Sequence, residues 1–69
     1  MTDHIYKSLE LTGTSTEGPQ KAIENAILRA HDTIRNIKWF EVGQVRGMVD
    51  NGKVTHWQVS IKLGFTLED

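Results

Sequence analysis

Residues 39–66 read WFEVGQVRGMVDNGKVTHWQVSIKLGFT, and this stretch predicts two β-strands joined by a tight turn. The turn is predicted at Asp50-Asn51-Gly52, because Asn and Gly tolerate the positive φ angles of hairpin turns. Apolar and polar side chains alternate along the second strand, predicted at 53–66. The apolar set is Trp57, Val59, Ile61, Leu63 and Phe65, and the polar set is His56, Gln58, Ser60 and Lys62. Alternation with a period of two predicts one face packed on a core and one open face.

The preceding strand, predicted at 39–49, alternates with one fault. Phe40 and Val42 have one parity, whereas Val45 and Val49 have the other. One extra residue repairs the pattern, so we predict a β-bulge at Gly43. The bulge divides the strand into two sets of side chains. Those predicted to face the helix are Phe40, Val42, Val45 and Gly47, and those predicted to face away are Trp39, Glu41, Gln44 and Arg46.

The first half of the chain predicts a strand followed by a helix. Residues 4–12 alternate as a strand, and residues 13–19 form a Gly, Ser and Thr-rich turn. The pattern at 20–35 predicts an amphipathic helix, and Pro19, just before it, fits the first helical position, with either Gly18 or Thr16 near the N-cap. Asn36 is a candidate for its left-handed C-cap. The apolar stripe of this helix is Ala22, Ile23, Ala26, Ile27, Ala30 and Ile34, continued by Ile37.

These elements predict one α+β domain spanning residues 1–69. Its order is β-α-β-β, with a three-stranded antiparallel sheet and one amphipathic helix on one face. A three-residue hairpin loop would bring Arg46 opposite His56 and Gln44 opposite Gln58. The chain has 69 residues and no cysteine, so a core this small needs support, and self-association is the remaining route.

Composition argues against several classes of protein. A formal net charge of -1 disfavours a nucleic-acid partner, and the three scattered histidines lack metal-ligand spacing. No signal peptide is evident, and no apolar run approaches the roughly 18 residues of a membrane span. A cytoplasmic location is therefore the default expectation. Ser60 and His56 lie about 13 Å apart along one strand, which excludes a shared proton and disfavours a hydrolase.

Three residues on the predicted open face are candidates for ligand binding. The Trp39 indole offers a plane for stacking an aromatic ring, although a tryptophan in a small domain is more often part of the core. Gln58 can both donate and accept at the edge of such a ring, or it is a solvated strand residue. Arg46 can bind a phosphate, or it forms an ion pair with Glu41 or Glu10.

Several motifs at their spacings resemble the dodecin family of small flavin-binding proteins, and the resemblance runs end to end. They are Leu11-Thr12-Gly13-Thr14-Ser15, Asn25-Ala26-Ile27, Trp39-Phe40-Glu41-Val42, Arg46-Gly47, Gly52-Lys53-Val54, Gln58-Val59, Gly64-Phe65 and Leu67-Glu68-Asp69. The resemblance implies a hollow homododecamer with inward sheets and outward helices. It further implies flavins stacked in pairs between tryptophans of neighbouring subunits.

By this resemblance, Trp39 matches the stacking tryptophan, Gln58 the glutamine that bonds the flavin edge, and Arg46 an arginine associated with phosphate-bearing ligands. FMN or riboflavin is the expected ligand, with FAD possible. Coenzyme A is uncertain, because Thr66 stands where many bacterial relatives have arginine. The implied function is flavin storage with photoprotective quenching rather than catalysis. The alternatives are a small flavin-dependent oxidoreductase, and a shell that binds coenzyme A or no flavin.

Overall fold

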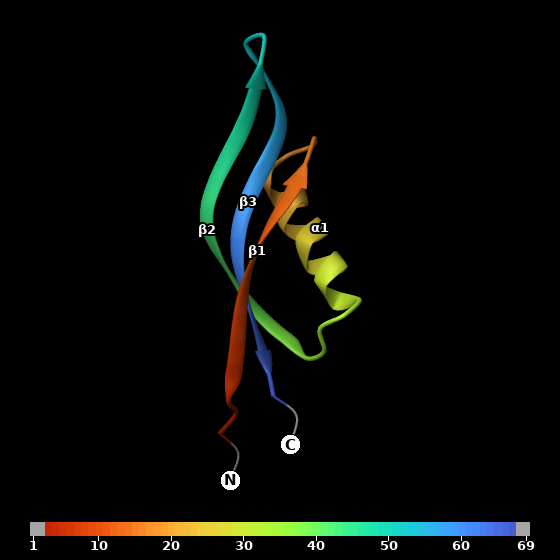
Figure 1. The fold of residues 1–69 in the computed structure, drawn as a ribbon, viewed down its shortest axis with the longest axis vertical. Coiled ribbons are helices and arrows are strands. Elements are labelled where there is room, and N and C mark those ends of the chain that lie inside the picture. The colour runs from red at the N-terminus through yellow and green to blue at the C-terminus, as the bar shows by residue number, and fades with distance from the viewer. Residues whose placement is uncertain (1–2, 68–69) are drawn as a thin grey trace.

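The computed structural model describes residues 3–67, which form three strands and one helix. The elements are β1 (Tyr6–Ser15), α1 (Pro19–His31), β2 (Ile37–Asp50) and β3 (Lys53–Thr66). The sheet has the order β1-β3-β2, and both strand pairs are antiparallel. Figure 1 shows α1 lying against one side of the sheet, while the β2–β3 hairpin projects beyond it. The predicted β-α-β-β fold is confirmed.

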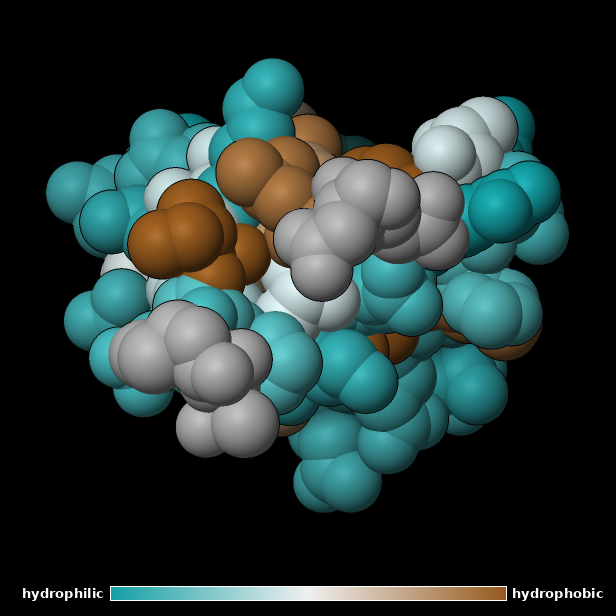
Figure 2. Space-filling view, turned by 90° about the horizontal axis from the view of Figure 1, so that it is seen from below, coloured by the Kyte–Doolittle hydropathy of each residue, from teal (hydrophilic) through white to brown (hydrophobic). Residues whose placement is uncertain are grey.

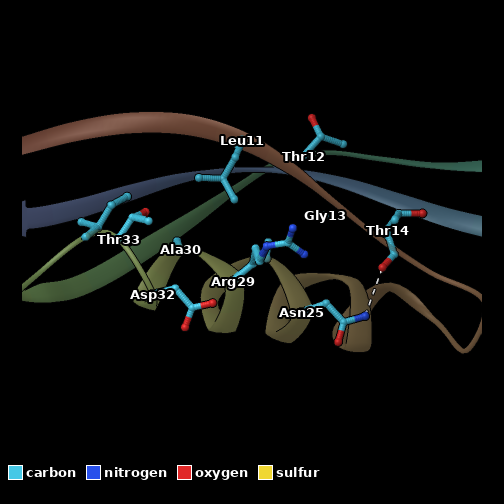
Figure 3. A pocket seen from close by; sticks show the side chains of 11 residues that line it. Leu11, Thr12, Gly13, Thr14, Asn25, Arg29, Ala30, Asp32 and Thr33 are labelled. Atoms are coloured by element: carbon cyan, nitrogen blue, oxygen red, sulfur yellow. Dashed lines mark hydrogen bonds between the residues drawn. The ribbon is translucent and has the colours of Figure 1, made fainter.

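The core lies between α1 and the middle of β3. Its buried side chains are Ala22, Ala26 and Ala30 from the helix, and Val59, Ile61 and Leu63 from the sheet. The small alanine side chains let α1 approach β1 closely. At Gly13 the approach is close enough that a Cβ atom would lie 2.9 Å from the carbonyl carbon of Ala22 and from the Cβ of Ala26. An Asn25 Nδ2 hydrogen bond to the Thr14 carbonyl oxygen, 3.1 Å long, also joins the two elements (Figure 3).

The predicted bulge is confirmed, since the pairing of β2 with β3 shifts between Val42 and Val45. The predicted three-residue hairpin loop is wrong. Asp50 pairs with Lys53, and the two turn residues Asn51 and Gly52 have φ angles of 53° and 78°. These positive values at both positions are those of a type I′ turn.

The same hairpin contains a second irregularity that the sequence analysis missed. Between Met48 and Val49 the register shifts again, and Thr55 is the extra residue on β3. Together, the shorter loop and the extra residue change the pairing of β2 with β3 by two positions for residues farther from the turn. As a result Arg46 pairs with Gln58 and Met48 with His56, so the predicted pairings of Arg46 with His56 and of Gln44 with Gln58 are both wrong.

Three predicted boundaries also differ from the structure. Residues 13–15, expected in a turn, belong to β1 and pair with residues 57–59 of β3. The helix ends at His31 rather than residue 35, because the N–H groups of Thr33 and Ile34 both bond to the Ala30 carbonyl, at 3.0 and 2.8 Å, and close its last turn. The N-cap is Gly18.

The segment that follows the helix differs from its prediction as well. Asn36 has a positive φ of 64°, yet it lies four residues beyond the C-cap Asp32 and therefore does not end the helix. Ile37, expected in the helical stripe, is the first residue of β2. The connection between α1 and β2 is therefore longer than the sequence predicted.

The apolar side chains of β2 are only partly as expected. Phe40, Val42 and Val45 pair with the buried residues of β3 and so share the α1 side of the sheet. They remain 48%, 43% and 51% exposed, because α1 packs on β1 and β3. They lie on the side of the sheet predicted to face the helix, but α1 does not cover them. Seen from the end that carries the termini, apolar atoms likewise reach the surface among hydrophilic ones (Figure 2).

Candidate functional site

The face of the sheet opposite α1, which we call the open face, carries a largely polar set of side chains. The cross-strand register defines its members, since paired residues point to the same side. They are Tyr6, Ser8, Glu10, Thr12 and Thr14 of β1, His56, Gln58, Ser60, Lys62, Gly64 and Thr66 of β3, and Trp39, Glu41, Arg46 and Met48 of β2. Trp39, Gln58 and Arg46 thus lie on one face, and it is the face without a helix.

Trp39 lies across the backbone of the central strand. It pairs with Gly64, and a Cβ atom built on Gly64 would lie within 2.5 Å of Cε2, Cζ2 and Cδ2 of the indole. A point in the plane of the ring could be this close to all three carbons only at bonding distance from one of them, so the Cβ position lies over the face of the ring. One face of the indole is therefore seated on the strand, and the residue remains 37% exposed.

Tyr6 of β1 flanks the indole. The two ring centroids are 6.3 Å apart with an interplanar angle of 60°. This separation falls in the range of favourable aromatic pairs. Tyr6 pairs with Thr66, two residues beyond Gly64 on β3, so its ring meets the indole diagonally across the sheet.

Gln58 and Arg46 form a cross-strand pair nearer the hairpin turn. A terminal nitrogen of Arg46, Nη2, donates a 2.6 Å hydrogen bond to Oε1 of Gln44, two residues before it. Glu10 and Glu41, the carboxylates suggested as partners of Arg46, both lie opposite Lys62 in the register. Arg46 and Gln58 are thus cross-strand neighbours on the open face, and the guanidinium is bonded to Gln44.

One chain does not bring all three predicted residues together. Gly64, which carries the indole, is six residues from Gln58 along β3, or about 20 Å at the usual rise per residue. A single flavin ring system does not span this distance. A site that uses both Trp39 and Gln58 therefore needs residues from more than one copy of the chain.

Depressions open to solvent lie on both sides of the sheet. On the open face, a depression of about 180 Å³ lies around Ser60, with Lys62 and Glu41 at its rim. On the other side, a groove of about 680 Å³ runs between β1 and α1, past Leu11, Asn25 and Arg29 (Figure 3). Neither collects Trp39, Gln58 or Arg46.

Sequence reasoning missed Gly64 and Tyr6 as parts of the site. Gly64 gave a usable signal, since a glycine inside a strand often marks the close approach of another group. Tyr6 has the parity of the open face, but no local pattern indicated that it would meet Trp39 from two strands away.

The comparisons with known proteins all find members of one family, the dodecins. A model of the dodecin family matches residues 5–68. The dodecin of Thermus thermophilus is 45% identical over 65 residues, covering 94% of both chains. The solved dodecin of Streptomyces coelicolor is 51% identical with a TM-score of 0.94, covering 100% of this chain and 99% of its own.

A more distant solved relative is described as a calcium dodecin. This Mycobacterium tuberculosis protein has a described calcium-binding site, is 26% identical with a TM-score of 0.80, and matches 93% of this chain and 91% of its own. Within residues 3–67 of the present chain, His, Asp and Glu side chains do not gather in groups of three or more suited to a metal ion. Over the same residues, α1 is too short and too polar to cross a membrane.

Proposed function

The chain belongs to the dodecin family, and on that premise we propose that it binds and stores flavin in a homododecameric shell. Dodecins are small binding proteins rather than enzymes. The observation that carries the proposal is the indole of Trp39, which has one face on Gly64 and lies on the helix-free face of the sheet. An exposed aromatic plane of this kind suits stacking against a three-ring heteroaromatic ligand.

The separation of Trp39 from Gln58 supports binding between copies of the chain. In the proposed arrangement, two indoles from neighbouring subunits enclose a pair of stacked flavins. Gln58 from an adjacent copy then donates to and accepts from the polar edge of each ring, which its amide is able to do. Association also covers the apolar residues that β2 leaves exposed.

FMN and riboflavin are the proposed ligands. Arg46 lies on the same face as Gln58 and pairs with it across the strands, so a phosphate of FMN has a guanidinium within reach. Thr66, which pairs with Tyr6 at the end of the sheet, provides no cation there, and we do not include coenzyme A among the proposed ligands.

Storage with quenching is favoured over turnover. A flavin stacked on both faces leaves little room for a substrate, and indole stacking gives the excited flavin a rapid route for electron transfer. The light energy is then lost as heat. Sustained oxidation of a reduced nicotinamide by the flavin-loaded protein would favour the oxidoreductase alternative instead.

The test is a fluorescence titration of riboflavin and FMN against three proteins. The unaltered chain should quench the emission of both ligands on binding. Trp39→Ala should lose quenching and most of the affinity, because the stacking plane is removed. Trp57→Phe is the matched control, since Trp57 pairs with Gly47 on the opposite side of the sheet, and it should retain both.

Equal quenching by Trp39→Ala and by the unaltered chain would overturn the stacking assignment. An unaltered chain that binds neither ligand would overturn the proposed function. Light scattering on the same samples measures the assembled mass and tests the dodecamer separately.

A further inference from the structure

We propose that Gly64 and Tyr6 are positioning residues that fix the plane of the Trp39 indole, so that a single ring face is presented for stacking. The inference rests on the proposed flavin site and adds to it the groups that set its geometry. Neither residue was a candidate from sequence. Neither needs to touch the ligand.

The first part of the argument concerns Gly64. A side chain on this residue would occupy the space of the six-membered ring of the indole, because its Cβ would fall within 2.5 Å of three ring carbons. Ordinary van der Waals contact between carbon atoms requires about 3.5 to 4.0 Å. The indole can lie flat on the sheet only because Gly64 has no side chain.

A comparison with other glycines of the sheet shows that the contact is specific to this position. A Cβ at Gly47 would find its nearest neighbour, Cγ1 of Val54, at 3.4 Å, and one at Gly43 would find the Ser60 carbonyl oxygen at 3.3 Å. Both substitutions require little movement. Only Gly64, among these three, lies directly beneath an aromatic ring.

The second part concerns Tyr6. Its ring is tilted by 60° to the indole at a centroid distance of 6.3 Å, and it approaches from β1, the far edge of the sheet. The absence of a side chain at Gly64 lets the indole lie against the strand backbone, while Tyr6 restricts its rotation toward β1. Together they hold one face of the ring against the sheet.

Fixing the ring in advance has a consequence for binding. A ligand that stacks on a mobile side chain must order that side chain as it binds, which lowers affinity. With the indole already seated, its outer face meets a flavin without this cost. Two such indoles facing each other across a pair of copies also define the space available to the stacked rings.

The experiment compares Gly64→Ala with Gly47→Ala, a matched substitution on the same sheet. Gly64→Ala should push the indole off the strand and weaken riboflavin binding about tenfold, which corresponds to roughly 1.4 kcal/mol. Gly47→Ala should bind riboflavin as the unaltered chain does. Light scattering should give the same assembled mass for all three proteins.

A second pair of variants tests the tyrosine and does not depend on the folding of Gly64→Ala. Tyr6→Ala removes the flanking ring and should weaken riboflavin binding several-fold. Tyr6→Phe keeps the ring and should bind riboflavin as the unaltered chain does. The near-ultraviolet circular dichroism of Trp39, recorded in a Trp57→Phe background without ligand, should change in Gly64→Ala and Tyr6→Ala. It should not change in Gly47→Ala or Tyr6→Phe.

The outcomes separate this inference from the proposed function. If the unaltered chain binds riboflavin and assembled Gly64→Ala or Tyr6→Ala binds it equally well, the positioning role is overturned while the flavin site stands. If the unaltered chain does not bind riboflavin, the proposed function fails. The dichroism of ligand-free Trp39 then still decides whether these two residues hold the indole.

Discussion

At single positions, the fold depends on where a side chain is absent. Gly13 and Gly64 both lie in strands, and each allows another group to lie against the backbone: α1 at Gly13, and the Trp39 indole at Gly64. Gly52 has the opposite character, since nothing lies within 4 Å of the space its Cβ would fill. Substitutions at Gly13 and Gly52 therefore separate a steric cost from a conformational one.

Gly13→Ala should destabilise the fold by steric conflict between β1 and α1. The added Cβ would clash with the Ala22 carbonyl group and the Ala26 side chain, and the helix must move away from the sheet to admit it. Overpacking of this kind costs about 1–3 kcal/mol. Urea unfolding at fixed protein concentration should show a lower midpoint than the unaltered chain, while Gly47→Ala should stay close to it. An unchanged midpoint for Gly13→Ala would mean that α1 does not lie this close to β1.

At the scale of the elements, the β2–β3 hairpin determines which residues share the open face. Its type I′ turn uses Asn51 and Gly52 at φ angles of 53° and 78°, and the register of Arg46 with Gln58 depends on it. A one-residue change in the loop would move each strand residue relative to its partner and turn the alternation to the other face.

Gly52→Ala tests the turn without a steric component. A residue with a Cβ atom at a φ of 78° incurs about 1–2 kcal/mol of conformational cost, and no neighbouring atom adds to it. Thermal unfolding should therefore occur at a lower temperature than in the unaltered chain. Asn51→Gly, which places a more permissive residue at the other turn position, should change the transition far less. Equal effects of the two substitutions would argue against a type I′ turn.

The parts of the fold that the sequence predicted are those governed by burial with a fixed period. Alternation in β3 and the parity fault at Gly43 indicated the helix-covered face and the bulge correctly, because a buried face repeats every second residue. Turn length was not predictable, since Asp50-Asn51-Gly52 suits either a two-residue or a three-residue loop. The extra residue Thr55 has neither the flexibility of glycine nor the geometry of proline, and it left no signal.

The candidate site was predictable only in part for a related reason. Parity correctly indicated that Trp39 faces away from α1. Its contact with Gly64 depends on the register between strands, and its contact with Tyr6 depends on the order β1-β3-β2, and neither follows from a local pattern. The distance between Trp39 and Gln58 likewise became apparent only once both were assigned to positions along β3.

At the scale of the whole molecule, one copy leaves apolar surface without cover. Every residue of β2 after Ile37 is exposed, including Phe40, Val42 and Val45 on the same side as α1. A thin molecule, 56 Å long and 13 Å in its shortest dimension, has little interior to compensate for this. We expect several copies to associate and cover this surface. The proposed flavin site also requires association, because Trp39 and Gln58 lie too far apart within one copy.

Val42→Asp should therefore reduce assembly, stability and flavin binding together. A carboxylate on the apolar side of β2 would be buried without a partner wherever another copy covers this strand, which is strongly unfavourable. Size-exclusion chromatography with light scattering should give a smaller mass than for the unaltered chain. The unfolding temperature of Val42→Asp should then rise with protein concentration, as expected when folding and association are linked.

Val42→Ile keeps an apolar side chain at the same position and should assemble normally. If Val42→Asp retained the full mass and quenched riboflavin like the unaltered chain, the uncovered side of β2 would not be a contact between copies, and the joining of Trp39 with a neighbouring Gln58 would have to occur through another surface.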